Sequence, residues 1–302
     1  MIDKIQTAYR ESGFNGLLLM GTERILRSAG MLLLSASNSL AEAATSLSPL
    51  SPRDRHTLEA NRAFRDKHKG QRCFVIGNGP SLKTQDLSPL AGEITFVMSG
   101  FWKHPIVGKW QPTYYCFADP LFFDGSEPMR QFFSSLRSRI HDSTFFVPLF
   151  AGKIIREQGL LPLERINYVA FCGSLSNGRI KDVNLTKFVP GVQSTAQLGI
   201  MAAIYMGCSP IYLLGLDHDW LAHRGMDRHF YEDKTVEGHP QAHGDLNLIS
   251  YKAEAKAVVD LWSGYEALLR LSSLRGIDIL NATNGGFLDV FHRVDYEEVV
   301  RR

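Results

Sequence analysis

Hydrophobic residues beyond position 72 gather in short runs, and each run ends at glycine, proline or polar residues. Runs of strand length that are apolar throughout are typical of strands buried on both faces. Longer segments with helical spacing separate these runs, at 129–140, 194–206 and 250–274. The predicted strands are 73–76, 94–98, 114–117, 144–148, 167–171, 211–215 and 278–280. Strands that alternate with helices predict an α/β fold, with a doubly wound, mostly parallel sheet covered on both faces.

The first fifty residues follow a different pattern. Residues 14–34 are rich in apolar side chains, but Glu23, Arg24 and Arg27 fall inside this stretch. A secretory signal has an unbroken apolar core, so an amphipathic helical extension is the better interpretation. Such a helix lies on a membrane surface or packs against a partner or its own domain. The expected organisation is this extension over 1–50, a linker and lead-in helix over 51–71, and the α/β domain over 72–302. The linker is indicated by the serines and prolines of the sequence SLSPLSPR over 46–53.

Composition narrows the class of protein. Of 302 residues, 44% are hydrophobic and 21% charged, which is ordinary for globular domains. The 33 basic and 31 acidic residues give a charge of +2, so no nucleic-acid partner is expected. No run of 18 apolar residues predicts a membrane-spanning helix. Cys73, Cys116, Cys172 and Cys208 lie far apart, as expected for buried thiols of a cytoplasmic protein and not for disulfides or a zinc site.

A glycine-rich turn, GNGPSL, directly follows the first predicted strand. In doubly wound sheets, ligands bind at loops beyond the carboxyl ends of the strands. Gly77 and Gly79 permit positive φ and close backbone approach, and Ser81 can cap exposed amides. Such amides bind an anion, which leaves Asn78 to hydrogen-bond a ligand. The turn is neither a P-loop nor GxGxxG, because Leu82 occupies the third glycine position, and a tight turn without a ligand is the alternative.

The string GNGPSL resembles the signature of the bacterial sialyltransferases that use CMP-sialic acid and of the related pterin-pyrophosphokinase-like (MptE-like) family, which includes motility accessory factors. Further motifs extend the resemblance to about residue 294: ADP after the third strand, PGVQST before a long helix, IYLLGLD, and the tail ILNATNGGFLDVFHRVD. The resemblance implies a Rossmann-like glycosyltransferase fold. It implies a donor site made of Gly77, Asn78, Gly79, Ser81, Ser99, Asp119, Gln193, Ser194, Thr195 and Asp217.

Two departures bear on the donor. The sialyltransferases carry asparagines that hold the cytidine nucleotide where this chain has Ser99 and Asp119. They also carry two phosphate-binding tyrosines after the Gly-x-Asp strand, where this chain reads HDWLAHR over 218–224. The resemblance therefore does not imply that CMP-sialic acid itself is the donor of this protein, although a donor linked to CMP remains the favoured class. Asp119 suits either a ribose hydroxyl or a divalent cation.

Five of the ten histidines fall between 218 and 243, after the Gly-x-Asp strand. The polar segment 217–247 is expected to be a long loop that acts as a lid. Pro240 and Gly244 oppose the helix that would pair His239 with His243 as zinc ligands, and no metal site is expected.

General-base chemistry is the favoured use of these histidines. Sugar transfer needs a group that takes the proton of the acceptor hydroxyl, and histidine titrates near neutral pH. The resemblance matches His229 to a His-Phe/Tyr pair of the MptE-like pattern, and His239 to the Gly-His pair of the sialyltransferases. His229 ranks first as the base and His239 second. Arg224 and Arg228 are expected to neutralise a diphosphate or an acidic sugar.

The expected function is transfer of a sugar, with a nonulosonic acid among the candidates, from a nucleotide sugar to a bacterial surface glycan or glycolipid. No cofactor is required, the extension suits the inner membrane surface, and related enzymes often form homo-oligomers. The alternative is a pterin pyrophosphokinase-type enzyme that uses ATP and Mg²⁺, with Asp119, Asp217 and Asp219 as metal ligands. A binding protein with a vestigial nucleotide turn is the third possibility.

Overall fold

The computed structural model describes residues 50–178, 180–223, 228–231 and 250–301. The chain divides at Pro49 into two units, and the second, Leu50–Arg302, contains all of these residues. The predicted extension over 1–50 therefore lies outside the described residues, except for Leu50. Within the described ranges, no helix is long and apolar enough to cross a membrane.

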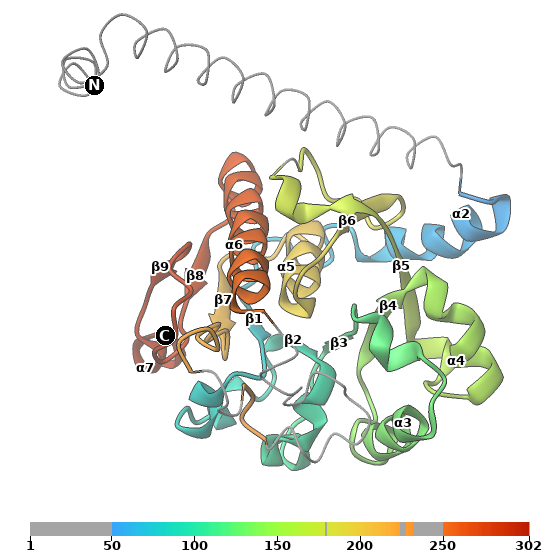
Figure 1. Ribbon diagram of the computed structural model, residues 1–302, viewed down its shortest axis with the longest axis horizontal. Coiled ribbons are helices and arrows are strands. Elements are labelled where there is room, and N and C mark those ends of the chain that lie inside the picture. The colour runs from blue at the N-terminus through green and yellow to red at the C-terminus, as the bar shows by residue number, and fades with distance from the viewer. Residues whose placement is uncertain (1–49, 179, 224–227, 232–249, 302) are drawn as a thin grey trace, which may run out of the picture. The chain divides into compact units, whose positions relative to one another are not determined.

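Among the described residues, nine strands form one sheet at the centre of this unit, in the order β6-β5-β4-β3-β2-β1-β7-β8-β9 (Figure 1). All eight pairings are parallel, and β1 pairs with both β2 and β7. The strands are β1 Cys73–Ile76, β2 Ile94–Met98, β3 Tyr114–Cys116, β4 Thr144–Pro148, β5 Ile166–Ser174, β6 Phe188–Gly191, β7 Ile211–Leu214, β8 Ile279–Asn281 and β9 His292–Arg293. The predicted doubly wound α/β fold is confirmed.

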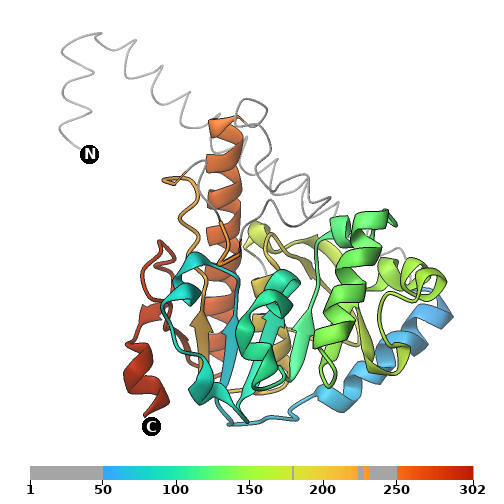
Figure 2. The same ribbon diagram turned by 90° about the horizontal axis from the view of Figure 1, so that it is seen from below.

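Helices cover both faces of the sheet. The helices of the described residues are α2 Pro52–Glu59, α3 Glu127–Arg139, α4 Gly152–Gln158, α5 Thr195–Tyr205, α6 Tyr251–Leu274 and α7 Tyr296–Val300, joined by several short 3₁₀ turns. Alternate strand residues face opposite sides, so the sheet carries two cores. One core packs on α5 and α6, and the other on α3, α4, α7 and the 3₁₀ turns, which lie in front of the sheet in Figure 2.

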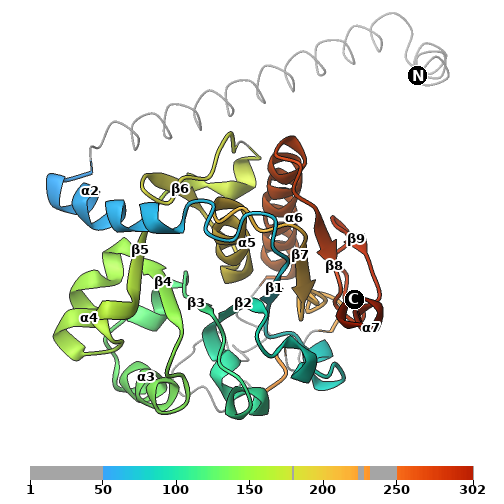
Figure 3. The same ribbon diagram turned by 180° about the vertical axis from the view of Figure 1, so that it is seen from behind.

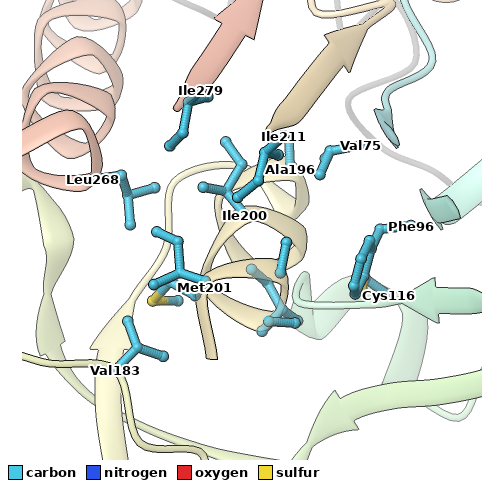
Figure 4. Packing of buried hydrophobic residues seen from close by; sticks show 14 of the residues in the cluster. Val75, Phe96, Cys116, Val183, Ala196, Ile200, Met201, Ile211, Leu268 and Ile279 are labelled. Carbon is cyan, nitrogen blue, oxygen red and sulfur yellow. The ribbon is translucent and has the colours of Figure 1, made fainter. Parts of the chain in front are cut away.

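Helix α5 lies against the centre of the sheet, and ten of its eleven residues are buried. A helix that is apolar on all sides is stable only inside a protein. Ile200 and Met201 belong to the same buried cluster as Val75 and Phe96 of the sheet (Figure 4). Helix α5 can approach the sheet this closely because Gly199 has no side chain: a Cβ atom there would lie only 3.2 Å from Val75 Cγ1.

Two strands, β6 and β9, and two short helices, α4 and α7, were not predicted, whereas α2 lies where the lead-in helix was expected. Strand β6 includes Pro190 of the PGVQST motif, and it forms an edge of the sheet, where a strand tolerates proline. Helix α2 begins within the predicted linker because Ser51 Oγ accepts a hydrogen bond from the amide of Asp54 at 3.0 Å. The chain after α2 then reaches the end of α5, where the Asp66 amide donates to the Tyr205 carbonyl (3.1 Å; Figure 3).

Candidate functional site

A cavity of about 480 Å³ opens at the carboxyl ends of the central strands. From β1 the chain builds the sheet outward to β6, and it then returns to place β7 on the other side of β1. The cavity lies at this reversal, which is where open α/β sheets bind ligands. Its wall includes most of the predicted donor residues: Gly77, Asn78, Gly79, Ser99, Asp119, Gln193, Ser194, Thr195 and Asp217. It also includes Arg228 and His229. Their functional roles stay predictions.

The turn after β1 is held against the end of β7. The amides of Gly77 and Gly79 donate to the carbonyls of Leu214 and Gly215, each at 2.8 Å. A Cβ atom on Gly77 would overlap the Gly215 carbonyl, and one on Gly79 would overlap the Asp217 carboxylate. Neither glycine has a positive φ, so of the two uses expected for them only the close backbone approach is found. The two glycines are needed because the chain approaches its own backbone here.

Asp217 completes this junction. Its Oδ1 accepts from the amide of Ser81 at 2.9 Å, and its Oδ2 accepts from the Ser81 hydroxyl at 2.8 Å. The amide of Ser81 is thus buried and paired with a carboxylate of the protein, and the Ser81 hydroxyl, which was expected to accept from an amide as a cap, donates instead. Ser81 does not line the cavity. Burial raises the pKa of Asp217, an effect that the bonds from Ser81 oppose and the neighbouring Asp219 strengthens.

Asp217→Asn should separate the contribution of the hydrogen bonds of this residue to stability from the effect of its charge. In this variant the asparagine Oδ1 can still accept from the Ser81 amide, and its Nδ2 can donate to the Ser81 hydroxyl, which reverses that bond. The free energy of unfolding of Asp217→Asn at pH 7 should therefore stay within about 1 kcal/mol of wild type, whereas Asp217→Ala should lose about 2–4 kcal/mol. Because folding raises the pKa of Asp217, the folded wild type retains this proton to higher pH than the unfolded chain, and its stability falls as pH rises from about 4 through the raised pKa.

Urea unfolding of wild type and Asp217→Asn at intervals from pH 4 to pH 7 measures this effect. The free energy of unfolding of Asp217→Asn should increase relative to that of wild type as the pH rises. If it instead decreases relative to wild type, the folded protein stabilises the ionised form of Asp217.

Asn78 joins the turn to two other walls of the cavity. Its Nδ2 donates to the Met98 carbonyl at the end of β2 (3.1 Å), and its main-chain oxygen accepts from the Phe230 amide (2.8 Å). The side chain is only 8% exposed. Within the described part of the chain, its Oδ1 has no hydrogen-bond partner. A buried acceptor left in this condition costs about 1–3 kcal/mol, so it is a candidate ligand contact.

His229 is placed by its neighbours in sequence. Phe230 packs edge-on against His104 (5.0 Å between ring centroids), and its amide is bound by Asn78 as described. Tyr231 lies directly over Gly100, which has no room for a Cβ. The ring of His229 stacks on Tyr231 at 4.9 Å with an interplanar angle of 6°. These contacts hold the histidine in the cavity wall.

Two wall residues have left-handed backbone. Ser99, after β2, has φ 47°, and His218, after β7, has φ 48°. Non-glycine residues rarely adopt this conformation unless their surroundings impose it. The carbonyl of Ser99 accepts from the Tyr115 hydroxyl at 2.7 Å, and the chain at His218 is fixed by the Phe287 amide, which donates to the Asp217 carbonyl at 2.7 Å.

The charged residues have protein partners. Arg228 Nη2 contacts Oε1 of Glu254, a side chain only 6% exposed, at 2.8 Å. The guanidinium charge that was expected to neutralise a ligand is therefore balanced within the protein. Asp119 Oδ1 accepts from the Leu121 amide at 2.9 Å and so caps a 3₁₀ turn. Among the described residues, no group of three His, Cys, Asp or Glu side chains is arranged to hold a metal ion.

His218 is a titratable wall residue that the sequence analysis did not select as a site residue. It counted there as one of five histidines, although its place directly after the Gly-x-Asp strand was a signal. Gln193, Ser194 and Thr195 lie at the start of α5 as expected, with Ser194 as its N-cap. Arg224 and His239 lie outside the described residues, as does most of the predicted lid.

No family model and no curated protein matches this chain. Among solved structures it is similar to the sialyltransferase CST-II in complex with a trisaccharide acceptor and CMP, at 15% identity and a TM-score of 0.44, over 74% of this chain and 86% of that one. It is also similar to the sialyltransferase CstII from Campylobacter jejuni in complex with the substrate analogue CMP-3FNeuAc, at 15% identity and a TM-score of 0.46, with the same coverage.

Proposed function

We propose that this protein is a glycosyltransferase that takes a sugar from a nucleotide-sugar donor bound in the cavity. A CMP-linked nonulosonic acid is the first candidate donor, and a bacterial surface glycan or glycolipid is the acceptor. The motif resemblance from GNGPSL to the C-terminal tail supports this choice. The cavity at the reversal of strand order supports a ligand of nucleotide size.

The observation that carries the proposal is the side chain of Asn78. Its buried Oδ1 has no partner within the described ranges, while its Nδ2 and main-chain oxygen are both used to hold the cavity wall. An amide oxygen held in this way can accept a hydrogen bond from a ribose hydroxyl or a base amino group. It gives the site a fixed, neutral contact for a nucleoside.

His229 is the proposed base. It would take the proton of the acceptor hydroxyl as that oxygen bonds to the anomeric carbon, while the bond from this carbon to the donor phosphate breaks. The N-terminus of α5 lies at the same cavity, and its partial positive charge favours the anionic leaving group. The Mg²⁺-dependent alternative has weaker support, since Asp119 and Asp217 are hydrogen-bonded to backbone amides.

A thermal-shift screen against CMP, CDP, UDP, GDP and ATP, each with and without Mg²⁺, tests the proposal. A ligand that binds only the folded state, at one hundred times its dissociation constant, adds about 2.7 kcal/mol to the free energy of unfolding. We expect a metal-independent shift with CMP, and Asn78→Ala should reduce it. A shift with ATP alone, and only with Mg²⁺, would replace the proposal by the pyrophosphokinase alternative.

The amphipathic pattern of residues 14–34 leads to a separate proposal, that the extension binds the inner membrane surface. Deletion of residues 1–48 should then abolish co-sedimentation with anionic phospholipid vesicles and leave transfer to a soluble acceptor unchanged. Loss of both properties would contradict this division between the extension and the α/β domain.

A further inference from the structure

A chain of polar side chains runs from the start of α5 through α6 to His218. The amide of Ala196 donates to Ser194 Oγ at 3.3 Å, in the first turn of α5. Tyr265 is a fully buried residue of α6, and the side chain of Ser194 opposes the rise that burial causes in the pKa of its hydroxyl. The Tyr265 hydroxyl lies 2.7 Å from Nε2 of His218. Three elements that are far apart in sequence thus meet at one imidazole.

The direction of this chain follows from its first member. Ser194 Oγ accepts from the Ala196 amide, and Ser194 lowers the pKa of Tyr265, which is the effect of a hydroxyl that donates to the phenolic oxygen. The proton of Tyr265 then goes to His218 Nε2, because each hydroxyl has one proton to donate. Nε2 is the acceptor in this arrangement, and the proton of the neutral imidazole resides on Nδ1.

The surroundings of His218 keep its ring neutral and fixed. The ring centroids of Trp220, Trp262 and Tyr265 lie 5.2, 6.0 and 5.4 Å from that of His218. Burial among these rings lowers the pKa of His218 to about 3. His218 nevertheless lines the cavity, and within the described ranges the structure gives no hydrogen-bond partner for Nδ1.

We propose that His218 is a ligand-binding residue that presents its Nδ1–H to an oxygen acceptor of the bound nucleotide sugar, with Ser194 and Tyr265 as positioning residues that fix its tautomer. This inference rests on the proposed function for the identity of the ligand. The acceptor is an oxygen of the phosphate or of the sugar, and both are bound by the same N–H donor. The helix start at Ser194 thereby acts on the ligand through two side chains.

The tautomer is measurable without a ligand. In ¹⁵N-histidine-labelled protein at pH 7, long-range ¹H–¹⁵N correlation spectra should show His218 as a neutral ring protonated on Nδ1, the resonance being assigned by its loss in His218→Phe. Tyr265→Phe removes one hydroxyl and should shift His218 toward the Nε2–H form. Tyr205→Phe is the matched control, because the Tyr205 hydroxyl is buried without a hydrogen-bond partner in the described part of the chain. An Nε2–H or protonated His218 in wild type would overturn the inference.

Calorimetric titration with cytidine, CMP and CMP-3FNeuAc identifies the oxygen. His218→Phe keeps an aromatic ring and removes the donor, so it should weaken CMP binding about tenfold or more if the partner is a phosphate oxygen, and leave cytidine binding unchanged. If the partner belongs to the sugar, only CMP-3FNeuAc should bind more weakly, by about two- to tenfold. His141→Phe, at an exposed site, is the control.

The two levels of inference fail in different ways. Wild-type protein that binds none of the three probes would contradict the CMP-linked donor of the proposed function. Wild-type protein that binds them with affinities unchanged in His218→Phe would contradict the role of His218 alone.

Discussion

Replacement of His229 by alanine is expected to lower the rate of sugar transfer about 10²- to 10⁴-fold, which is the usual contribution of a general base. The fold should be unaffected, because the backbone at this position is held by the bond from the Phe230 amide to Asn78 and by the packing of Phe230. Initial rates at saturating donor and acceptor, with the donor found by the nucleotide screen, measure the loss.

His292→Ala is the matched control, since His292 is an exposed histidine of β9 that does not line the cavity. It should transfer sugar at the wild-type rate. If His229→Ala retains more than half of the wild-type rate, His229 is not the base, and His239→Ala becomes the next variant to measure.

Replacement of Gly79 by alanine is expected to lower the free energy of unfolding by about 3–5 kcal/mol. The added methyl group would overlap the Asp217 carboxylate and the carbonyl of Gly215, so the turn must move away from β7. That movement breaks the two bonds between Asp217 and Ser81 and leaves a buried carboxylate without partners. Urea unfolding at pH 7, followed by circular dichroism, measures the loss.

Gly108→Ala provides the control for this experiment. Gly108 has no positive φ, and a Cβ there would meet no atom within 4 Å. Its free energy of unfolding should therefore remain within about 0.5 kcal/mol of wild type. Equal stabilities for the two alanine variants would mean that the turn after β1 can separate from β7 at no cost.

The central strands could be predicted because they are short, apolar throughout and bounded by turn residues. Strands β1, β2 and β4 coincide with the predicted ranges, and β3, β5, β7 and β8 differ only at their ends. Strand β9 has two exposed residues, and α4 and α7 have seven and five residues, so none of them has a periodic pattern long enough to recognise. Their positions depend on the sheet against which they pack.

The cavity wall could be predicted at the level of loops, since the carboxyl ends of parallel strands share one edge of a sheet. The partners within it could not. The bonds from Ser81 to Asp217 span 136 positions of the chain, and the contact of Arg228 with Glu254 unites two segments that no sequence pattern connects. Several groups that the sequence analysis assigned to a ligand therefore also have partners within the protein.

The left-handed backbone of Ser99 and His218 also bears on how this protein would respond to laboratory evolution. Each strained residue costs of order 1–3 kcal/mol, which glycine would avoid at the expense of a more flexible unfolded chain. Selection for heat resistance alone should therefore favour glycine at both positions, and selection for activity should oppose it. A library screened in both ways would show, at each of the two positions, how much folding stability is lost by keeping the side chain that the cavity contains.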